Sequence, residues 1–426
     1  CRGCSDCWSA APQLLLEPMT MPERPGEHKL DLDEFDNSDI YERRAIIERL
    51  ADKRADAAEN LRVLATHLRV KSHSLDLDDA ELYRMAVSKL TIGELTHPDL
   101  VTMAKIHGDP IVHADSFWRK IVERRRKKQL GPVPEKYLGI GKERDQLFAQ
   151  ILGVRMPQIH YTGPLDGIPR ALKEDTLLKP TNSSDSRGAF YLFHEQNIYS
   201  IERSSTLTSW DEMIANIVDS LGESHANAPT WQVQELVYED DVHPARDIKF
   251  YCFYGQIGLI LEALRHPTRQ YAYFDGHGSP VEVGRSHEPR FRDSADTVVD
   301  KGGLTAEMLD YVRWLSGEIP APFMRMDFLR TEDGLVFLEF SSAPGWSHTW
   351  NQEWDRRFGE YYLDAEMRLV EDLLEGKAYS GWRDFMDRQA AGQTGIELPD
   401  PLPRRDSVPN PKRRMSHRIL RAIAGE

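Results

Sequence analysis

The 426-residue sequence has no long apolar run, few cysteines and no excess of basic residues. A membrane-spanning helix needs about 20 consecutive apolar residues, so we expect no stable insertion into a membrane. The chain holds 54 Lys and Arg against 69 Asp and Glu, which gives a net charge of −15. This acidic balance disfavours nucleic acid as a partner.

Four cysteines are too few for a disulfide framework, which favours a cytoplasmic location. Three of them, Cys1, Cys4 and Cys7, lie at the start of a sequence that does not begin with Met. A metal site would need a fourth ligand, and the remaining cysteine, Cys252, lies in an apolar run typical of a strand. We therefore interpret residues 1–20 as an upstream or disordered segment, neither a metal site nor a signal peptide.

The N-terminal third lacks a Gly-rich βαβ pattern, and its periodicity is helical. Apolar residues near helical spacing predict helices over 39–69, 78–90 and 115–129. The third helix ends in the basic run Arg124–Lys128, which is typical of a solvated helix end. A clamp for an anionic substrate is the alternative. We expect residues 21–135 to form a helical N-terminal module.

From residue 136 the pattern changes to short strands separated by turns and a few helices. The predicted helices cover 142–152, 209–221, 305–315 and 365–374. The predicted strands cover 175–180, 189–193, 231–237, 247–254, 257–264, 271–274 and 281–283.

A loop of small polar residues, 181–188, lies between the first two predicted strands. Such a loop can fold over phosphate groups with its backbone N–H groups, and Lys179 at the strand end adds a positive charge. A plain hairpin loop with a surface lysine is the alternative. The GK[ST] sequence of a Walker motif is absent.

Residues 323–345, FMRMDFLRTEDGLVFLEFSSAPG, have the pattern of a β-hairpin. A two-residue Asp-Gly loop would place Asp327 and Glu339 on opposite faces of the sheet. A three-residue Glu-Asp-Gly loop would set them opposite each other on one face. In that register Arg325 faces Ser341 on the same side. The other face is then apolar, with Met324, Met326, Phe328, Leu338 and Phe340.

Two carboxylates beside an arginine are typical of a divalent-metal platform, because Mg²⁺ prefers one or two carboxylates plus phosphate oxygens. The neighbouring Arg325 can stabilise an anionic intermediate. A solvated face of an edge hairpin, with an ordinary Asp–Arg pair, is the alternative, and the spacing alone does not decide between them.

The motifs follow a recognisable order: a lysine-led helix at Lys142, Leu178-Lys-Pro with its Ser-rich loop, Glu235-Leu-Val, Ala245-Arg-Asp-Ile-Lys-Phe-Tyr-Cys-Phe-Tyr-Gly255, and RMD…LEFSSAPG. In this order the chain resembles the ATP-grasp superfamily over about residues 142–374. Within it, the strand at 245–255 is similar to the D-x-K-F-Y-C-F-x-G strand of the TupA-like group, which is associated with teichuronopeptide and cell-surface polysaccharide biosynthesis.

The resemblance implies an α+β ATP-grasp fold, in which two α+β subdomains grip ATP, preceded by the helical module. The ATP-grasp domain would cover 136–378. Its phosphate-loop subdomain would be about 176–237 and its metal-hairpin subdomain about 238–378. Residues 379–426 would form a Pro-rich basic tail.

The resemblance also implies roles for single residues. ATP would be bound by Lys142, Lys179, Ser183, Ser184, Ser186, Gly188, Glu235, Leu236, Val237 and Asp247. The magnesium ligands would be Asp327, Glu339 and Ser341, with Ser341 where the family has Asn; a hydroxyl is a weaker metal ligand than an amide oxygen. Catalytic roles would fall to Arg325, Lys249 and Arg187.

The implied activity is that of an ATP- and Mg²⁺-dependent carboxylate–amine ligase, which joins small-molecule substrates through an acylphosphate. Its setting would be cell-surface polysaccharide or peptide-conjugate biosynthesis. A kinase on the same fold is one alternative, with His348 or Asp355 as the base. A non-catalytic ATP-binding module is another, and a homodimer is left open.

Overall fold

The computed structural model describes residues 32–72, 77–90, 95–96, 98–99, 101–103, 116–169, 172–181, 186–222, 230–240, 242–284, 299, 303–345, 350–393 and 395. The chain divides into two compact units, Cys1–Ile111 and Val112–Glu426. The N-terminal cysteines and the basic stretch near the C-terminus lie outside the described residues. Among the described residues, no helix combines the length and apolar character that crossing a membrane requires.

The first unit is helical, as predicted, and contains α1 (Leu32–Asn37), α2 (Ile40–Ser72) and α3 (Leu77–Val87). The C-terminal part of α2 packs on α3 through a small apolar core that includes Ala65 and Tyr83. The Tyr83 hydroxyl donates to the Asp99 carboxylate (3.0 Å), which also pairs with Arg69 (3.0 Å). One polar cluster therefore closes the end of this core.

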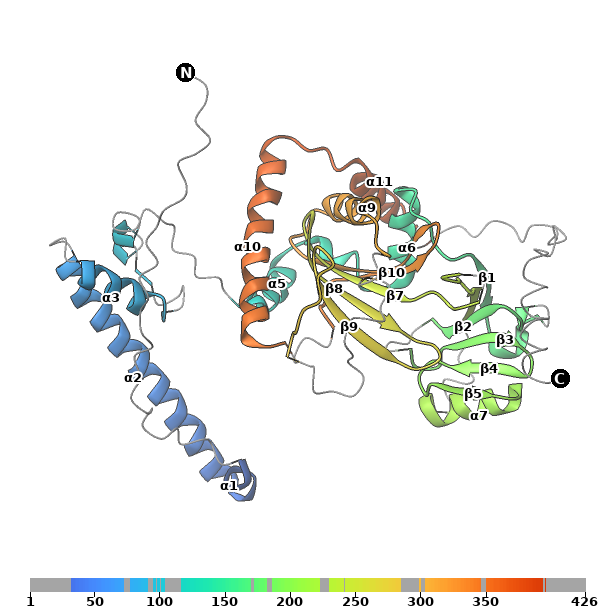
Figure 1. The fold of residues 1–426 in the computed structure, drawn as a ribbon, viewed down its shortest axis with the longest axis horizontal. Helices are drawn as coiled ribbons and strands as arrows, with labels where there is room; N and C mark the ends of the chain where they lie inside the picture. The colour runs from blue at the N-terminus through green and yellow to red at the C-terminus, as the bar shows by residue number, and fades with distance from the viewer. Residues whose placement is uncertain are drawn as a thin grey trace. The chain divides into compact units, whose positions relative to one another are not determined.

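Two antiparallel sheets form the body of the second unit (Figure 1). The six-stranded sheet has the order β1-β6-β2-β3-β4-β5, and the five-stranded sheet has the order β11-β10-β7-β8-β9. The strands of the first are β1 (Ile159–Gly163), β2 (Thr176–Pro180), β3 (Phe190–His194), β4 (Asn197–Ser200), β5 (Ser205–Leu207) and β6 (Trp231–Glu235). Those of the second are β7 (Asp247–Phe253), β8 (Gln256–Leu264), β9 (Gln270–Asp275), β10 (Met324–Thr331) and β11 (Gly334–Ser341).

Several helices of the second unit begin at a side-chain cap. The side chains of Ser209, Thr305 and Asn351 each accept a hydrogen bond from the backbone N–H three residues later. The helices are α5 (Phe117–Leu130), α6 (Lys142–Ile151), α7 (Trp210–Leu221), α9 (Ala306–Gly317), α10 (Gln352–Leu374) and α11 (Ser380–Ala390). Two short 3₁₀ turns, η2 (Pro134–Lys136) and η3 (Leu165–Gly167), complete them.

Strand β7 has two faces with different partners, because successive side chains of a strand point to opposite sides. Ile248 and Phe250 lie in the main core beneath the five-stranded sheet, together with residues of α6, α9 and α11. On the other face, Phe253 packs against α5 and α10, while Asp247 and Lys249 turn towards the six-stranded sheet. The polar residues of β7 therefore line a cavity, as their alternation suggested.

Two helices lie outside the boundaries expected from the sequence. Helix α5 belongs to the second unit, where Phe117 is fully buried against Phe358 and Tyr362, although 21–135 had been assigned to the N-terminal module. Helix α11 lies in the expected tail, 379–426, yet its Phe385 is fully buried against Phe148 of α6. Helix α5 had been grouped with the preceding helices because its own pattern is helical, and α11 had been grouped with the tail because a Pro-rich segment follows it.

Three smaller expectations differ from the structure. The basic run at the end of α5 is not simply solvated: Arg124 is buried near Glu135, and Lys127 pairs with Glu366 of α10 (3.0 Å). None of the run lines the cavity, so it is not an anion clamp there. Residues 281–283 form no strand, and the helix predicted over 365–374 begins earlier, at Gln352.

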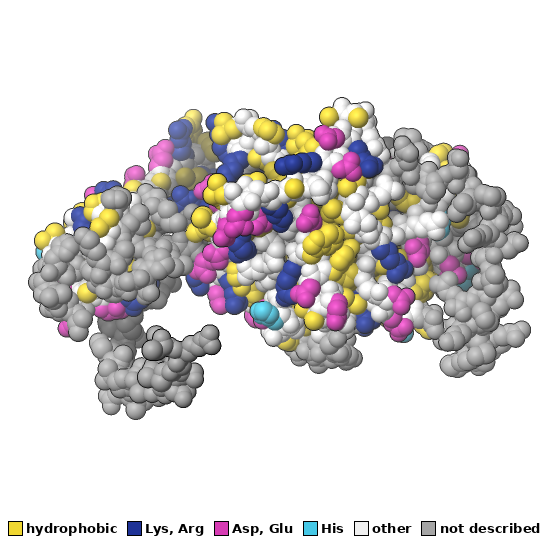
Figure 2. Space-filling view, turned by 90° about the horizontal axis from the view of Figure 1, so that it is seen from above, with side chains coloured by type: hydrophobic (Ala, Val, Ile, Leu, Met, Phe, Trp, Pro, Cys, Tyr) yellow, Lys and Arg dark blue, Asp and Glu magenta, His cyan; other side chains and the backbone are white. Residues whose placement is uncertain are grey.

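The surface in Figure 2 carries interspersed acidic and basic side chains over the described part of the chain. Among the described residues, exposed ion pairs one helical turn apart include Arg388–Asp384 (3.0 Å) and Arg313–Asp310 (2.7 Å). Exposed pairs of this kind contribute little to stability.

Candidate active site

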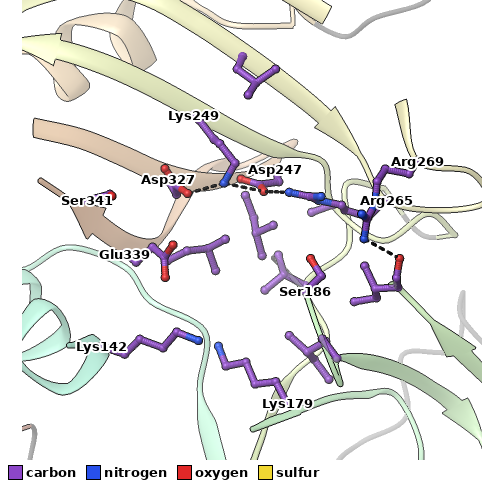
Figure 3. A pocket seen from close by; sticks show the side chains of 18 of the residues that line it. Lys142, Lys179, Ser186, Asp247, Lys249, Arg265, Arg269, Asp327, Glu339 and Ser341 are labelled. Atoms are coloured by element: carbon purple, nitrogen blue, oxygen red, sulfur yellow. Dashed lines mark hydrogen bonds and ion pairs between the residues drawn. The ribbon is translucent and has the colours of Figure 1, made fainter. Parts of the chain in front are cut away.

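A cavity of about 490 Å³ lies between the two sheets (Figure 3). It gathers most of the residues singled out in the sequence. Those that line it are Lys142, Lys179, Ser186, Arg187, Glu235, Leu236, Val237, Asp247, Lys249, Arg325, Asp327, Glu339 and Ser341. Ser183 and Ser184 lie outside the described residues. Gly188 does not line the cavity, because its N–H points to Glu202 (3.4 Å).

The β10–β11 hairpin has the predicted register at the site. Asp327 lies opposite Glu339, and Arg325 lies opposite Ser341. Neither predicted loop is correct, however, since Thr331 pairs with Gly334 and leaves a two-residue Glu-Asp loop. If the register set by Thr331 and Gly334 continued along the strands, Glu339 would point to the core face. A shift of one residue in the pairing moves every side chain of a strand to the opposite face.

A β-bulge between Asp327 and Phe328 restores the polar face. Phe328 pairs with Phe337 and Asp327 with Glu339, so Leu338 is the extra residue. Leu338 consequently lines the cavity, not the apolar core where the sequence pattern had placed it. The bulge adds an apolar contact to the site without displacing its carboxylate.

Asp327 is the centre of a buried ion-pair network. It is 1% exposed, and Arg325 donates to both of its oxygens, from Nε to Oδ1 (2.8 Å) and from Nη2 to Oδ2 (2.9 Å). The Lys249 ammonium also donates to Oδ2. Burial lowers the pKa of Lys249, but the Asp247 and Asp327 carboxylates raise it by more. The net pKa shift is upward, so Lys249 is a cation.

Asp247 holds two cations, one on its own strand and one just after β8. Its Oδ2 pairs with Lys249 (3.0 Å) and with Arg265 (2.8 Å), which follows β8. The other oxygen, Oδ1, is buried without a hydrogen-bond partner among the described residues. Asp247 therefore links the β10–β11 hairpin, through Lys249, to the β8–β9 side of the cavity.

Lys142 and Lys179 approach each other from different elements (Figure 3). Lys142 begins α6, and Lys179 lies near the end of β2. Neither has an ion pair among the described residues. Burial, followed by the charge of Lys142, lowers the pKa of Lys179 to about 7. The Glu339 carboxylate offsets only part of this effect, so the two lysines form a site that favours an anion.

Asp145 fixes α6 against the β10–β11 hairpin. Its carboxylate accepts the backbone N–H of Gly139 (2.9 Å) and that of Phe340 (3.2 Å), next to Glu339. Burial raises the pKa of Asp145 to about 8. The sequence showed only an acid in the first turn of a helix, so this role was missed.

The segment Glu235–Val237 borders the cavity where the chain passes between the sheets. The Glu235 N–H donates to the Gln158 carbonyl (2.8 Å), and the Val237 carbonyl accepts from the Ala245 N–H (2.9 Å). The Val237 N–H has no partner among the described residues. Apolar side chains surround it in the cavity wall, from Leu177, Leu236, Ala245, Leu329 and Leu338.

Two predicted site residues make local contacts. Arg187 donates to the Ser220 carbonyl (2.7 Å), and the Ser341 hydroxyl donates to the Ala343 carbonyl (2.8 Å). Of the two bases considered for a kinase, Asp355 accepts the Trp118 N–H (3.1 Å) and does not line the cavity, while His348 lies outside the described residues.

The β8–β9 side of the cavity was missed in the sequence. It consists of Arg265, Arg269, Tyr271 and Tyr273, and Tyr191 of β3 lines the cavity with them. The available signal was the alternation of Tyr271 and Tyr273 directly after two arginines. Without the fold, nothing in that alternation distinguishes a cavity wall from a solvent-exposed strand.

Comparison with known proteins gives a family for this arrangement. The family model TupA-like ATPgrasp matches residues 145–363, slightly more than half of the chain. No curated protein matches the chain.

Several solved structures are weakly similar. One is the D-alanine–D-alanine ligase from Bacillus anthracis complexed with ATP: 10% identity, 55% of this chain and 68% of that chain covered, TM-score 0.30. A second is the ATP-grasp ligase PsnB complexed with minimal precursor, Mg and ADP: 14% identity, 60% and 73% covered, TM-score 0.32. A third is the D-cycloserine synthetase DcsG: 18% identity, 59% and 79% covered, TM-score 0.29. Likenesses this weak assign no residue role to the present chain.

Proposed function

This chain belongs to the TupA-like ATP-grasp family, and we propose that it is an ATP- and Mg²⁺-dependent carboxylate–amine ligase. The observation that carries the proposal is the meeting of two carboxylates, Asp327 and Glu339, with two unpaired lysines, Lys142 and Lys179, around one cavity. Phosphoryl transfer requires positioning and charge neutralisation, not a protein nucleophile.

The adenine base would lie at Glu235–Val237. The unpartnered Val237 N–H can donate to a ring nitrogen, and the apolar wall can cover both faces of a flat ring. Leu338, which the bulge turns into the cavity, belongs to that wall. The residues present therefore fit a nucleotide base.

The phosphates would lie between the two lysines and the metal hairpin. Anionic oxygens would return Lys179 to its charged form by offsetting the repulsion from Lys142. Among the described residues, no three His, Cys, Asp or Glu side chains gather into a metal site. The Asp327–Glu339 pair suits Mg²⁺, which takes one or two carboxylates and completes its shell with phosphate and water.

In the proposed reaction, an oxygen of the substrate carboxylate bonds to the γ-phosphorus, and the bond to the β-phosphate oxygen breaks, releasing ADP. An amine nitrogen then attacks the carbonyl carbon of the acylphosphate. Inorganic phosphate leaves, and the nitrogen loses a proton to give the amide. Arg325, held by Asp327 and close to Glu339 (3.8 Å), would stabilise the charge that develops on the transferred group.

Further parts of the proposal rest on family membership. The two sheets would be the phosphate-loop and metal-hairpin subdomains, about 176–237 and 238–378. The setting would be cytoplasmic synthesis of cell-surface polysaccharides or peptide conjugates. Arg187 and Lys249 would contact the transferring phosphate.

The proposal is tested by ADP release with Mg²⁺ and ATP, using a panel of carboxylates with and without hydroxylamine. Hydroxylamine converts an acylphosphate into a hydroxamate. We expect ADP and hydroxamate with the correct acid, and loss of about a hundredfold or more in Asp327→Asn and Glu339→Gln, the usual scale for removing a transition-state charge contact. Glu353→Gln, on the outer first turn of α10, serves as the matched control.

Two outcomes would contradict the ligase. ADP release that depends on a sugar or polyol, with no hydroxamate from any acid, would indicate a kinase. Calorimetry that detects no binding of Mg²⁺ and ATP to the wild-type chain would exclude both enzymes.

A further inference from the structure

One side of the cavity has no role in the proposed ligase. We call it the β9 arm and define it as Arg265, Arg269, Tyr271, Tyr273 and Tyr191. Figure 3 shows Arg265 and Arg269 across the cavity from Glu339 and Ser341, and well away from Lys142 and Lys179.

Arg269 is a cation without a carboxylate partner among the described residues. One of its terminal nitrogens donates to the Ile201 carbonyl (3.1 Å), and its Nε is buried with no hydrogen-bond partner among those residues. Enclosing a guanidinium without a counter-ion is costly, and an anion in the cavity would offset that cost.

Arg265 is held in place beside it. Its two terminal nitrogens donate to Asp247 (2.8 Å) and to the Tyr271 hydroxyl (3.2 Å). The loop that carries both arginines is also attached to the six-stranded sheet, because the Tyr199 hydroxyl donates to the Pro267 carbonyl (2.7 Å). The β9 arm is therefore preorganised from both sheets.

The β9 arm is distinct from the place proposed for the phosphates. The phosphates would lie among Lys142, Lys179 and Glu339, whereas the Asp247–Lys249 ion pair (3.0 Å) stands between the metal carboxylates and Arg265. A planar guanidinium suits the two oxygens of a carboxylate or the oxygens of a phosphate. The neighbouring tyrosines supply apolar faces and hydroxyl donors for the rest of the ligand.

We propose that Arg269, beside Arg265, binds a carboxylate or phosphate group of a substrate that takes no part in the ligation. The substrate that binds on this side therefore carries an anionic group in addition to the group that reacts. This inference rests on the proposed function for the location of the nucleotide, but its subsite can be tested without turnover.

The test uses inorganic sulfate as the probe and the full chain saturated with Mg²⁺ and a non-hydrolysable ATP analogue, at constant ionic strength. Melting temperature against sulfate concentration gives an apparent Kd. We expect sulfate to stabilise the wild type and to bind about tenfold more weakly to Arg269→Gln, the loss expected for one charge-assisted hydrogen bond. Arg269→Lys, which keeps the charge, should fall between them.

Arg119→Gln, an exposed charge loss on α5, is the matched control and should leave the sulfate response unchanged. An equal response in wild type and Arg269→Gln, or no response in the wild type, would overturn the subsite. A response that disappears when the analogue is bound would assign the anion to the nucleotide and also overturn it. If the analogue itself does not bind, the ligase proposal fails, and the dependence of sulfate binding on Arg269 still decides the subsite.

Discussion

At the scale of single residues, the fold disfavours the charged form of Lys179. Its pKa falls from 10.5 to about 7 because of burial and, secondly, because of Lys142. The unfolded chain therefore binds more protons than the folded chain between these two pH values, so stability rises with pH across that window. Below about pH 7 the folded chain carries the full cost of the charge.

Replacing the lysine by a neutral side chain should remove that cost. Without nucleotide, Lys179→Met is expected to raise the melting temperature at about pH 6.5 by about 1 to 2 °C, the shift that roughly 1 kcal/mol produces in a unit of this size. The gain should shrink towards zero at about pH 10, where the wild-type lysine is neutral in the folded chain. An equal gain at both pH values, measured by calorimetry, would show that packing and not charge is responsible.

Residue types in the site could be predicted, but their partners could not. Asp327, Glu339, Lys142 and Lys179 lie in segments whose alternation or motif order is visible in the sequence. Asp145 and Arg269 were missed because their roles depend on contacts with Phe340 and Ile201, which are distant in the sequence. Local patterns contain no information on such contacts.

At the scale of elements, the turn after β11 determines where Arg325 lies. Gly345 has a φ of +80°, and a Cβ there would lie 2.7 Å from a terminal nitrogen of Arg325. The same guanidinium donates to the Pro344 carbonyl (3.5 Å). Only glycine leaves room for Arg325 to reach Asp327 from this side.

Gly345→Ala should therefore lower the turnover number by about tenfold or more, the scale of a displaced transition-state contact. Its stability should fall by only about 1 to 2 kcal/mol, the cost of a left-handed backbone for a residue with a Cβ. Gly376→Ala is the matched control, because Gly376 has a φ of +84° and open space around its Cβ position. Equal turnover in the two variants would rule out the steric explanation.

The same hairpin shows where element-level prediction ends. Alternation and turn residues identified both strands and one correct register, yet both proposed loops were wrong. A two-residue loop and a bulge at Leu338 together reach the predicted Asp327–Glu339 pairing. The bulge turns Leu338 into the cavity wall, and strand periodicity does not reveal such a bulge.

At the scale of the whole molecule, two helices that are far apart in the sequence, α5 and α11, complete the core of the second unit. Phe117 of α5 and Phe385 of α11 are fully buried on opposite faces of the five-stranded sheet. The linker-like composition around α11 concealed its apolar stripe, Trp382, Phe385 and Met386. Fold class and most elements were predictable, whereas domain limits depend on which helices return to the core.

Truncation tests the role of α11. A chain ending at residue 378 should lose at least about 3 to 5 kcal/mol of unfolding free energy, the usual cost of removing one large buried aromatic. A chain ending at residue 391 keeps α11 and serves as the control. If the two chains unfold at the same midpoint concentration of denaturant, α11 contributes nothing to the stability of the core.

The path of the chain through the two sheets has a mechanical consequence. The six-stranded sheet is one continuous insertion between α6 and β7, and its two ends run side by side, since β1 pairs with β6 and the Glu235 N–H donates to Gln158. Any swing of this lobe must therefore pivot at that edge. An adenine ring held at Val237 would lie near the pivot and barely move. Lys179, which lies three residues along β2 from the Thr176–Glu235 pair, would move further.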